Sequence, residues 1–205
     1  MKIPLSFYID VSGQPTSEIF VGLISIHDLE MSKLIKSIKE KYPFFIRNKQ
    51  KASKMQPQHI KSIISFLNNM KVRMSCIHLK SSSWNELIDY VGINKQNKIE
   101  MIFAVLYFIA LEKYSQKENI YPLTICIETF MDIDKVMLNL KKLAKAHNRD
   151  FQISKSQARY TEMIKFADIV AGAGRKITRE NLKYEFFYFE TPDLEKIKFY
   201  LRKLK

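Results

Sequence analysis

The sequence contains few cysteines and histidines, and their placement excludes two classes of protein. Only two of the 205 residues are cysteine, Cys76 and Cys126, and each stands inside an apolar, strand-like stretch. Both are therefore expected to be small buried side chains, and a disulfide framework is not expected. The four histidines are scattered without a Cys or His partner at the spacing of zinc ligands. A zinc-binding module is excluded on the same ground.

Long apolar runs are also lacking. The longest, residues 101–111, is about half of the roughly 20 residues that a membrane-spanning helix needs. We interpret it as a central core helix. The N-terminal Met-Lys-Ile-Pro-Leu runs directly into a strand pattern and lacks the apolar core and cleavage site of a signal peptide. We therefore expect a cytoplasmic protein without a membrane partner.

Acidic residues are scarce relative to basic ones. The 34 Lys and Arg residues outnumber 21 Asp and Glu, which leaves a formal charge of +13 and a pI near 9.6. Such a surface attracts phosphate backbones, so the charge favours nucleic acid, DNA or RNA, as the partner. Lysine-rich surfaces also occur on proteins that bind no nucleic acid, and this alternative stays open.

The order of elements predicts an α/β fold in one domain over residues 1–205. Two apolar runs around Ser12-Gly13-Gln14-Pro15 predict an antiparallel hairpin. A helical insertion follows at residues 28–70, in which Asp28 caps a first helix and Pro57 opens a second. Between them the basic segment 47–54 is expected to be a solvated loop or strand edge. Further strands are expected at 72–79, 123–129 and 151–153, and further helices at about 95–115, 132–147 and 158–177.

The C-terminal extension, residues 178–205, contains an aromatic, strand-like stretch at 184–189 and a final helix opened by Thr191-Pro192. An apolar stripe on this helix is expected to pack back on the domain. Because the opposite face of the helix is lysine-rich, binding to a partner helix or to a membrane surface is an alternative. The stripe consists of Leu194, Ile197, Leu201 and Leu204.

Three carboxylates stand against apolar surroundings. Asp10 and Glu128 end apolar strand-like runs, and Asp168 lies within Phe-Ala-Asp-Ile-Val-Ala-Gly-Ala, where a helix otherwise carries no charge. A buried carboxylate must be neutralised, hydrogen-bonded or bound to a cation. Three such acids together would suit Mg²⁺ or Mn²⁺ and the metal-assisted hydrolysis of phosphodiesters. Taken singly, Asp10 is better explained by a turn before Ser12 and Glu128 by an exposed strand end; the metal-site hypothesis depends on the three acids together.

The motifs Tyr-Ile-Asp-Val-Ser-Gly at 8–13, Phe-Val-Gly-Leu-Ile at 20–24 and Phe-Ala-Asp-Ile-Val-Ala-Gly at 166–172 resemble an uncharacterised family of ribonuclease H-like proteins. That family opens with Asp-Glu-Ser-Gly and closes with an Ala-Asp-Leu-Val-Ala-Gly-type helix. The resemblance spans about residues 5–177. It implies a mixed sheet in which the first three strands are antiparallel and helices and strands then alternate.

The same resemblance implies roles for individual acids. Asp10 corresponds to the metal ligand of the first strand, Glu128 to that of the fourth strand and Asp168 to that of the last helix, while Glu100 falls where ribonuclease H carries another carboxylate. Two positions depart from the pattern: Val11 replaces an acid in the opening motif, and Glu stands at 128 where Asp is common. Either departure implies altered metal geometry or lost catalysis.

The leading hypothesis is a nuclease that depends on Mg²⁺ or Mn²⁺, with Asp10, Glu128 and Asp168 as catalytic metal ligands. A catalytically silent nucleic-acid-binding or assembly protein is the alternative, favoured by Val11 and by the lack of a clear general base. A third hypothesis, a helical interaction module, depends only on the last fourteen residues. The expected contacts with the phosphate backbone are Lys49, Lys51, Lys54, Arg175 and Lys176.

Overall fold

A computed structural model describes residues 5–14, 18–43, 51–92, 98–118, 123–127, 132–149, 152–155 and 161–205. Within these residues, six strands form one sheet in the order β5-β4-β1-β2-β3-β6. The strands are β1 (Leu5–Gly13), β2 (Ile19–His27), β3 (Arg73–Leu79), β4 (Leu123–Ile127), β5 (Gln152–Lys155) and β6 (Phe187–Glu190). The α-helices are α1 (Asp28–Lys41), α3 (Pro57–Asn69), α4 (Ser81–Val91), α5 (Lys98–Glu118), α6 (Ile133–Ala146), α7 (Thr161–Lys176) and α8 (Leu194–Arg202); the short helices are η1 (Ala52–Lys54) and η3 (Arg179–Leu182).

The sheet is mixed, as the sequence predicts. β1 pairs antiparallel with β2, and β2 pairs antiparallel with β3. β4 lies parallel to β1, and β5 lies parallel to β4. The aromatic C-terminal stretch supplies β6, which pairs in parallel with β3 and extends that edge of the sheet. β4 is therefore a central parallel strand, in agreement with its continuous apolar sequence.

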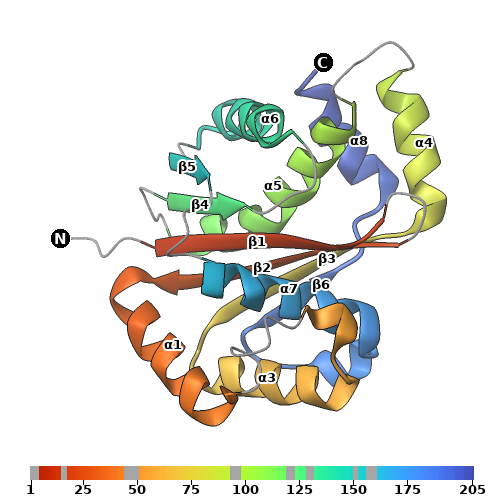
Figure 1. Cartoon of the computed structure of the whole chain (residues 1–205). Helices are drawn as coiled ribbons and strands as arrows, with labels where there is room; N and C mark the ends of the chain where they lie inside the picture. The colour runs from red at the N-terminus through yellow and green to blue at the C-terminus, as the bar shows by residue number, and fades with distance from the viewer. Residues whose placement is uncertain are drawn as a thin grey trace.

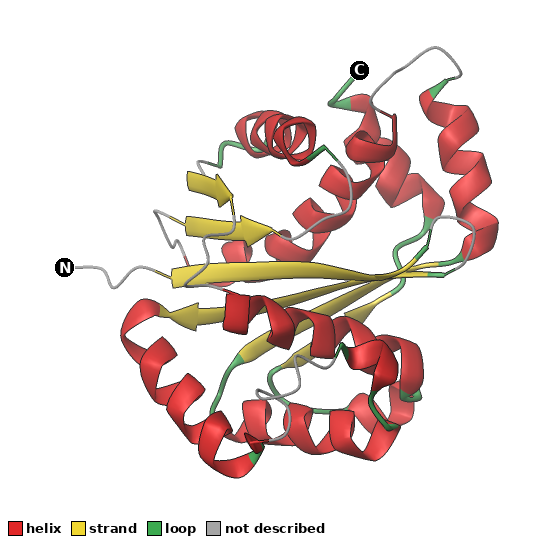
Figure 2. Ribbon diagram, viewed as in Figure 1, coloured by secondary structure: helices red, strands yellow, loops and turns green. Residues whose placement is uncertain are grey.

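Helices cover both faces of the sheet (Figures 1 and 2). Helices α4, α5, α6 and α8 lie on one face, while α1, α3 and α7 lie on the other. Strand alternation divides the apolar side chains between two buried clusters, so that Phe7 and Ile9 face α5 whereas Tyr8 faces the layer of α7. Asp10 therefore belongs to the α7 face.

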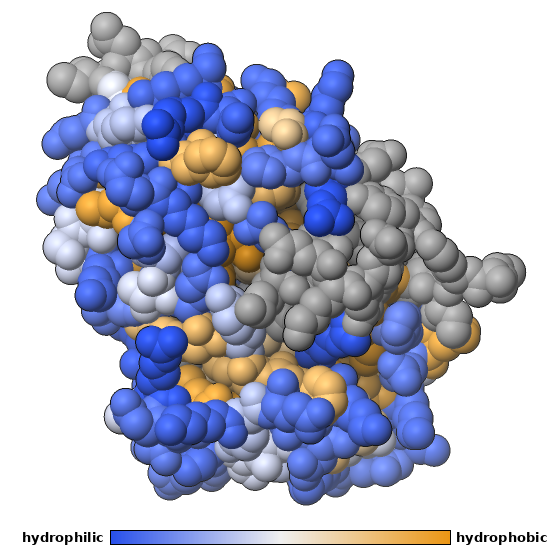
Figure 3. Space-filling model, turned by 180° about the vertical axis from the view of Figure 1, so that it is seen from behind, coloured by the Kyte–Doolittle hydropathy of each residue, from blue (hydrophilic) through white to orange (hydrophobic). Residues whose placement is uncertain are grey.

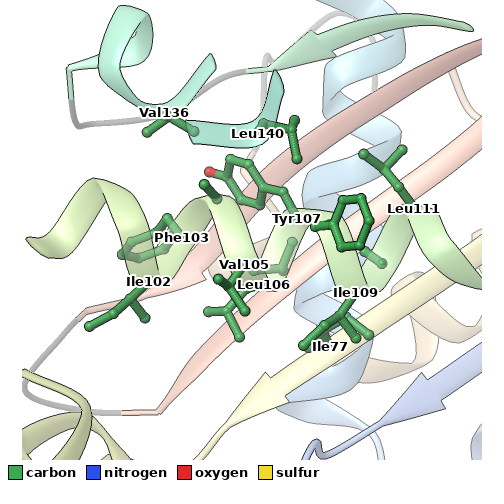
Figure 4. Close-up of a cluster of buried hydrophobic side chains, with 14 of the residues drawn as sticks. Ile77, Ile102, Phe103, Val105, Leu106, Tyr107, Ile109, Leu111, Val136 and Leu140 are labelled. Atoms are coloured by element: carbon green, nitrogen blue, oxygen red, sulfur yellow. The ribbon is translucent and has the colours of Figure 1, made fainter. Parts of the chain in front are cut away.

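Helix α5 is the centre of the first layer. All its residues from Met101 to Leu111 are buried, which confirms the prediction of a core helix. Figure 4 shows how α5 side chains pack toward Val136 and Leu140 of α6 and toward Ile77 of β3. A helix that is apolar on all sides needs such cover on all sides. In the described part of the chain, no helix is both long and apolar enough to span a membrane.

The C-terminal stripe packs back on the molecule, as expected. Ile197 and Leu201 of α8 are fully buried in the cluster around α5. The Tyr200 hydroxyl donates a hydrogen bond of 2.6 Å to the Glu112 carboxylate of α5. Phe199 remains partly exposed on the outer side of α8.

Figure 3 shows the face of the molecule opposite to Figure 1, where hydrophilic residues dominate and apolar ones gather in a band across the lower half.

Two local predictions are wrong, and one helix was not predicted. β3 ends at Leu79 as expected, but Ser81 then begins α4. Asp28 is the first residue of α1 rather than its cap; its carboxylate accepts a hydrogen bond from Ser6 Oγ at 2.5 Å. The basic segment 47–54 is not wholly solvated, since Ala52 is completely buried at the start of η1. Ala52 has a tertiary partner, Gly172 of α7, that local sequence cannot reveal.

Candidate active site at the carboxyl end of the first strand

Gly22 brings α7 into contact with the sheet. It lies opposite Asp10 in the antiparallel register of β1 and β2. A Cβ atom at Gly22 would lie 2.1 Å from the carbonyl oxygen of Ala167 and 2.4 Å from the amide nitrogen of Ala171. The missing side chain therefore lets the α7 backbone touch β2. This contact fixes α7 beside the strand that carries Asp10.

Asp168 lies between the two residues of that contact. Its side chain is partly buried, and Oδ2 accepts a hydrogen bond of 2.8 Å from the backbone N–H of Ala52. The helix approaches the sheet through Ala167 and Ala171, whereas Gly172 faces Ala52: a Cβ at Gly172 would lie 2.5 Å from Ala52 Cβ. Hence the small residues around Asp168 serve two contacts, one with β2 and one with η1.

Asp10 is partly buried near the carboxyl end of β1. Because it is the direct cross-strand partner of Gly22, its side chain lies on the face that α7 covers. Its Oδ1 accepts a hydrogen bond of 2.7 Å from the backbone N–H of Val11. Val11 itself points to the other face, where it packs against the apolar cluster around α5. A carboxylate at position 11 would thus face a different layer from Asp10.

Of the other two expected ligands, one falls outside the described residues and the other lies on the opposite face of the sheet. Glu128 lies outside the described residues; the described part of β4 ends at Ile127, whose partner in β1 is Ile9. Glu100 is in the first turn of α5, in the layer on the opposite face of the sheet. Among the described residues, no group of three or more His, Cys, Asp or Glu side chains is placed to hold a metal ion.

The expected phosphate contacts lie around η1 and the end of α7. Lys49 falls outside the described residues, and Lys51, Lys54 and Arg175 are exposed. The Lys176 ammonium donates hydrogen bonds to the carbonyl oxygens of Ser53 at 2.7 Å and Met55 at 2.8 Å. Lys176 therefore holds the carboxyl end of η1 on α7, while Asp168 holds its amino end.

One titratable residue on this face was not proposed as functional from the sequence. His78 lies opposite Phe20, on the same face as Asp10, and its ring stacks on Phe20 with centroids 4.5 Å apart. Its Nε2 lies 3.3 Å from Glu18 Oε1, and its Nδ1 lies 3.3 Å from Thr191 Oγ1. Burial lowers the pKa of His78, although Glu18 opposes that effect. Strand alternation places His78 on this face, but the partners come from segments far apart in the sequence.

Comparison with known structures identifies the fold. The chain is similar to Bst-RNase HIII in complex with Mn²⁺, with a TM-score of 0.56 and 14% identity, over 89% of this chain and 54% of that one. It is also similar to a mutant form of Bst-RNase HIII, with a TM-score of 0.55 and 15% identity, over 89% of this chain and 53% of that one. No family model and no curated protein matches the sequence.

The fold is therefore ribonuclease H-like, with the mixed sheet, the helical insertion after the first hairpin and the C-terminal helix that the sequence predicts. The chain spans about half the length of the two RNase HIII chains. At such low identity the likeness concerns the fold alone. Function has to be argued from the residues that this chain places around Asp10 and Asp168.

Proposed function

We propose that this protein is a divalent-metal-dependent nuclease that hydrolyses phosphodiester bonds of nucleic acid. One observation carries the proposal: Asp10 and Asp168 come from distant parts of the sequence to the same face of the sheet, where Gly22, the cross-strand partner of Asp10, touches α7 at Ala167 and Ala171, the residues that flank Asp168. Two partly buried acids at such a contact raise the free energy of the folded state unless hydrogen bonds or cations compensate them. Each carboxylate accepts one backbone hydrogen bond, and we propose that divalent cations bind both as well.

The metal ligands would be Asp10, Asp168 and Glu128. The described donors fit Mg²⁺ or Mn²⁺, since both ions prefer carboxylate oxygens. When bound, such ions activate water and stabilise the leaving oxygen in phosphodiester hydrolysis. The chain's own part is to orient the donors: the Val11 N–H holds one oxygen of Asp10, and the Ala52 N–H holds one oxygen of Asp168.

Basic residues beside this site would hold the nucleic-acid backbone. Lys51, Lys54 and Arg175 are exposed around η1 and the end of α7, and the formal charge of +13 favours long-range attraction of a polyanion. We include Lys49 from its place in the same basic run. Lys176 would act partly through position, because its hydrogen bonds to Ser53 and Met55 fix the segment that presents the other lysines.

A catalytically silent nucleic-acid-binding protein is the second candidate. Val11 favours it, because this position carries an apolar side chain directed to the other face of the sheet. The position of Glu100 favours it as well, since the first turn of α5 belongs to the opposite layer. Such a protein would keep the basic surface for nucleic acid and would not hydrolyse phosphodiester bonds.

The deciding experiment is a cleavage assay with single- and double-stranded DNA, RNA and hybrids, with Mn²⁺ or with EDTA. Asp10→Asn and Asp168→Asn should each lower the rate by about a hundredfold or more, because the ions supply several kcal/mol of transition-state stabilisation. Asp168→Asn keeps an acceptor for the Ala52 N–H, so it changes charge with little change in structure. Asp89→Asn, on the exposed side of α4, is the matched control. Glu128→Gln tests the third ligand.

Binding measurements, taken together with the cleavage assay, separate the two candidates. Both predict an affinity that falls linearly with the logarithm of salt concentration, and Lys54→Gln should reduce that slope by about one unit. Lys141→Gln, exposed on α6, should leave it unchanged. Salt-dependent binding without Mn²⁺-dependent cleavage would establish the silent binding protein. Cleavage that persists in Asp10→Asn and Asp168→Asn would refute the proposed site.

A further inference from the structure

The outer face of α3 forms the floor of a groove, which we call the α3 groove. Helix α3 packs on α7, farther from the sheet (Figure 1), and a hollow of about 400 Å³ lies along its solvent side. The lining residues of α3 recur every three or four positions, so they share one face of the helix. They are Gln58, Lys61, Ser62, Ser65, Phe66 and Asn69. The buried residues of α3 occupy the opposite face, and they are Ile60, Ile63, Ile64 and Leu67.

Side-chain contacts fix both borders of the α3 groove. At the border formed by the end of α1, the Tyr42 hydroxyl donates a hydrogen bond of 3.1 Å to the Ser62 carbonyl. The Tyr42 ring meets the Phe66 ring edge to face, with centroids 5.8 Å apart. At the border formed by η3, the Lys61 ammonium donates a hydrogen bond of 3.3 Å to Asn181 Oδ1. The groove is therefore preorganised, and a ligand would have to order few of its side chains.

Cations and aromatic rings lie together in the α3 groove, and no acid is among the described residues that line it. The Lys41 ammonium lies 4.8 Å from the centroid of the Phe66 ring. Phe66 is half-buried although it stands on the polar face of α3, and Tyr184 at the edge of the groove is half-buried as well. Single-stranded nucleic acid is bound by this combination, in which cations contact phosphates and bases stack on rings. The hydroxyl and amide groups of the floor suit phosphate and sugar oxygens.

The amino end of α3 connects the α3 groove with the proposed phosphate contacts of η1. Two residues separate the end of η1 at Lys54 from the start of α3 at Pro57. We propose that the α3 groove binds single-stranded nucleic acid that continues from η1, with phosphates at Lys41 and Lys61 and a base on Phe66. The inference rests on the proposed function only for the end of the groove at which the strand enters. Binding in the groove itself requires neither metal nor cleavage.

Fluorescence anisotropy of a labelled oligothymidylate with the full chain in EDTA tests the α3 groove without cleavage. Phe66→Leu keeps an apolar side chain but removes the ring, so binding should weaken about fivefold or more, as expected for one lost stack. Lys61→Gln, at an exposed position, should weaken binding and reduce the salt slope by about 0.7. Phe199→Leu on α8 and Lys142→Gln on α6 are matched controls beyond the other face of the sheet, and both should bind as the unchanged protein does.

Two competitors show what the α3 groove recognises. Duplex DNA keeps its bases paired and stacked, so its binding should be insensitive to Phe66→Leu; an equal loss for duplex and single strand would overturn the proposal. Polyglutamate with the same number of charges should compete poorly, and equal competition would show that the groove attracts any anionic chain.

Unchanged binding of the oligothymidylate in both Phe66→Leu and Lys61→Gln would also overturn the proposal. That result differs from a failure of the proposed function, in which no cleavage is seen or cleavage persists in Asp10→Asn and Asp168→Asn. In that case the two groove variants should still bind the oligothymidylate less tightly in EDTA. Conversely, cleavage that requires Mn²⁺ and Asp10, together with normal binding by the groove variants, would leave the nuclease and exclude the groove.

Discussion

Gly22→Ala is expected to displace α7 from the sheet. The added Cβ would lie 2.1 Å from the Ala167 oxygen and 2.4 Å from the Ala171 nitrogen, whereas non-bonded heavy atoms prefer about 3.5 Å. Both close atoms belong to the α7 backbone, so no side chain can rotate away and the helix has to retreat by about 1 Å. Overpacking of this kind costs about 1–3 kcal/mol of folding free energy. A shift of about 1 Å in Asp168 would lower cleavage by about a hundredfold.

Urea unfolding and the Mn²⁺ cleavage assay measure the two effects on the same preparation. A second substitution, Ala171→Gly, serves as a control because it removes the Cβ that would lie 3.0 Å from the new atom but leaves both backbone contacts. Gly22→Ala/Ala171→Gly should therefore remain as defective as Gly22→Ala. If Gly22→Ala unfolds at the same urea concentration as the unchanged protein, the close contact does not position α7. If Gly22→Ala/Ala171→Gly instead regains the stability and cleavage rate of the unchanged protein, the clash lies between the new Cβ and the Ala171 side chain and not with the α7 backbone.

Three further outcomes follow from contacts on the same face. Gly172→Ala should expose η1 to trypsin at Lys54, and Ala52→Gly in the same chain should restore protection, since this clash joins two Cβ positions at 2.5 Å. Lys176→Met should speed the same cleavage, because it removes two hydrogen bonds to η1; an unchanged rate would show that they do not hold the segment. His78→Gln should flatten the pH dependence of stability: burial lowers the pKa of the folded His78, so the unfolded chain takes up the proton first and stability falls below about pH 6.5. Urea midpoints between pH 7.5 and 5 that still fall equally steeply in His78→Gln would contradict this.

The fold was predictable where local pattern and global structure agree. The apolar run 101–111 is too long for a strand, too short to span a membrane and apolar on all sides, which leaves a buried helix, α5. Asp132 caps α6 through bonds to the amides of Asp134 and Lys135, and Pro57 occupies the first turn of α3, both as expected. α4 escaped prediction because Ser81 and its serine neighbours are typical of a strand break and of a helix start alike.

The site was predictable only in part. Asp168 could be selected because its neighbours are apolar, and Asp10 because it follows an apolar strand. Neither signal could reveal that Gly22, opposite Asp10, makes the close contact with α7, or that Gly172 contacts η1 rather than the sheet. Both facts depend on pairings across more than a hundred residues. The basic segment was judged solvated from its composition, yet one alanine in it is buried by α7.

The hydrogen bond from Ala52 to Asp168 connects the proposed metal site with the proposed phosphate contacts. A cation that binds the Asp168 carboxylate withdraws charge from the oxygen that accepts this bond and so weakens the bond. A polyanion that binds Lys51 and Lys54 exerts an electrostatic force on the same short helix, η1. Lys176 holds the other end of η1 and limits how far the helix can shift. Binding of metal and binding of nucleic acid are therefore expected to change one another's affinity, and linkage requires the two changes to be equal. Asp168→Asn, which keeps the acceptor but removes the charge, should abolish that mutual dependence in titrations with Mn²⁺ and oligonucleotide; a coupling that survives the substitution would have to pass through other residues.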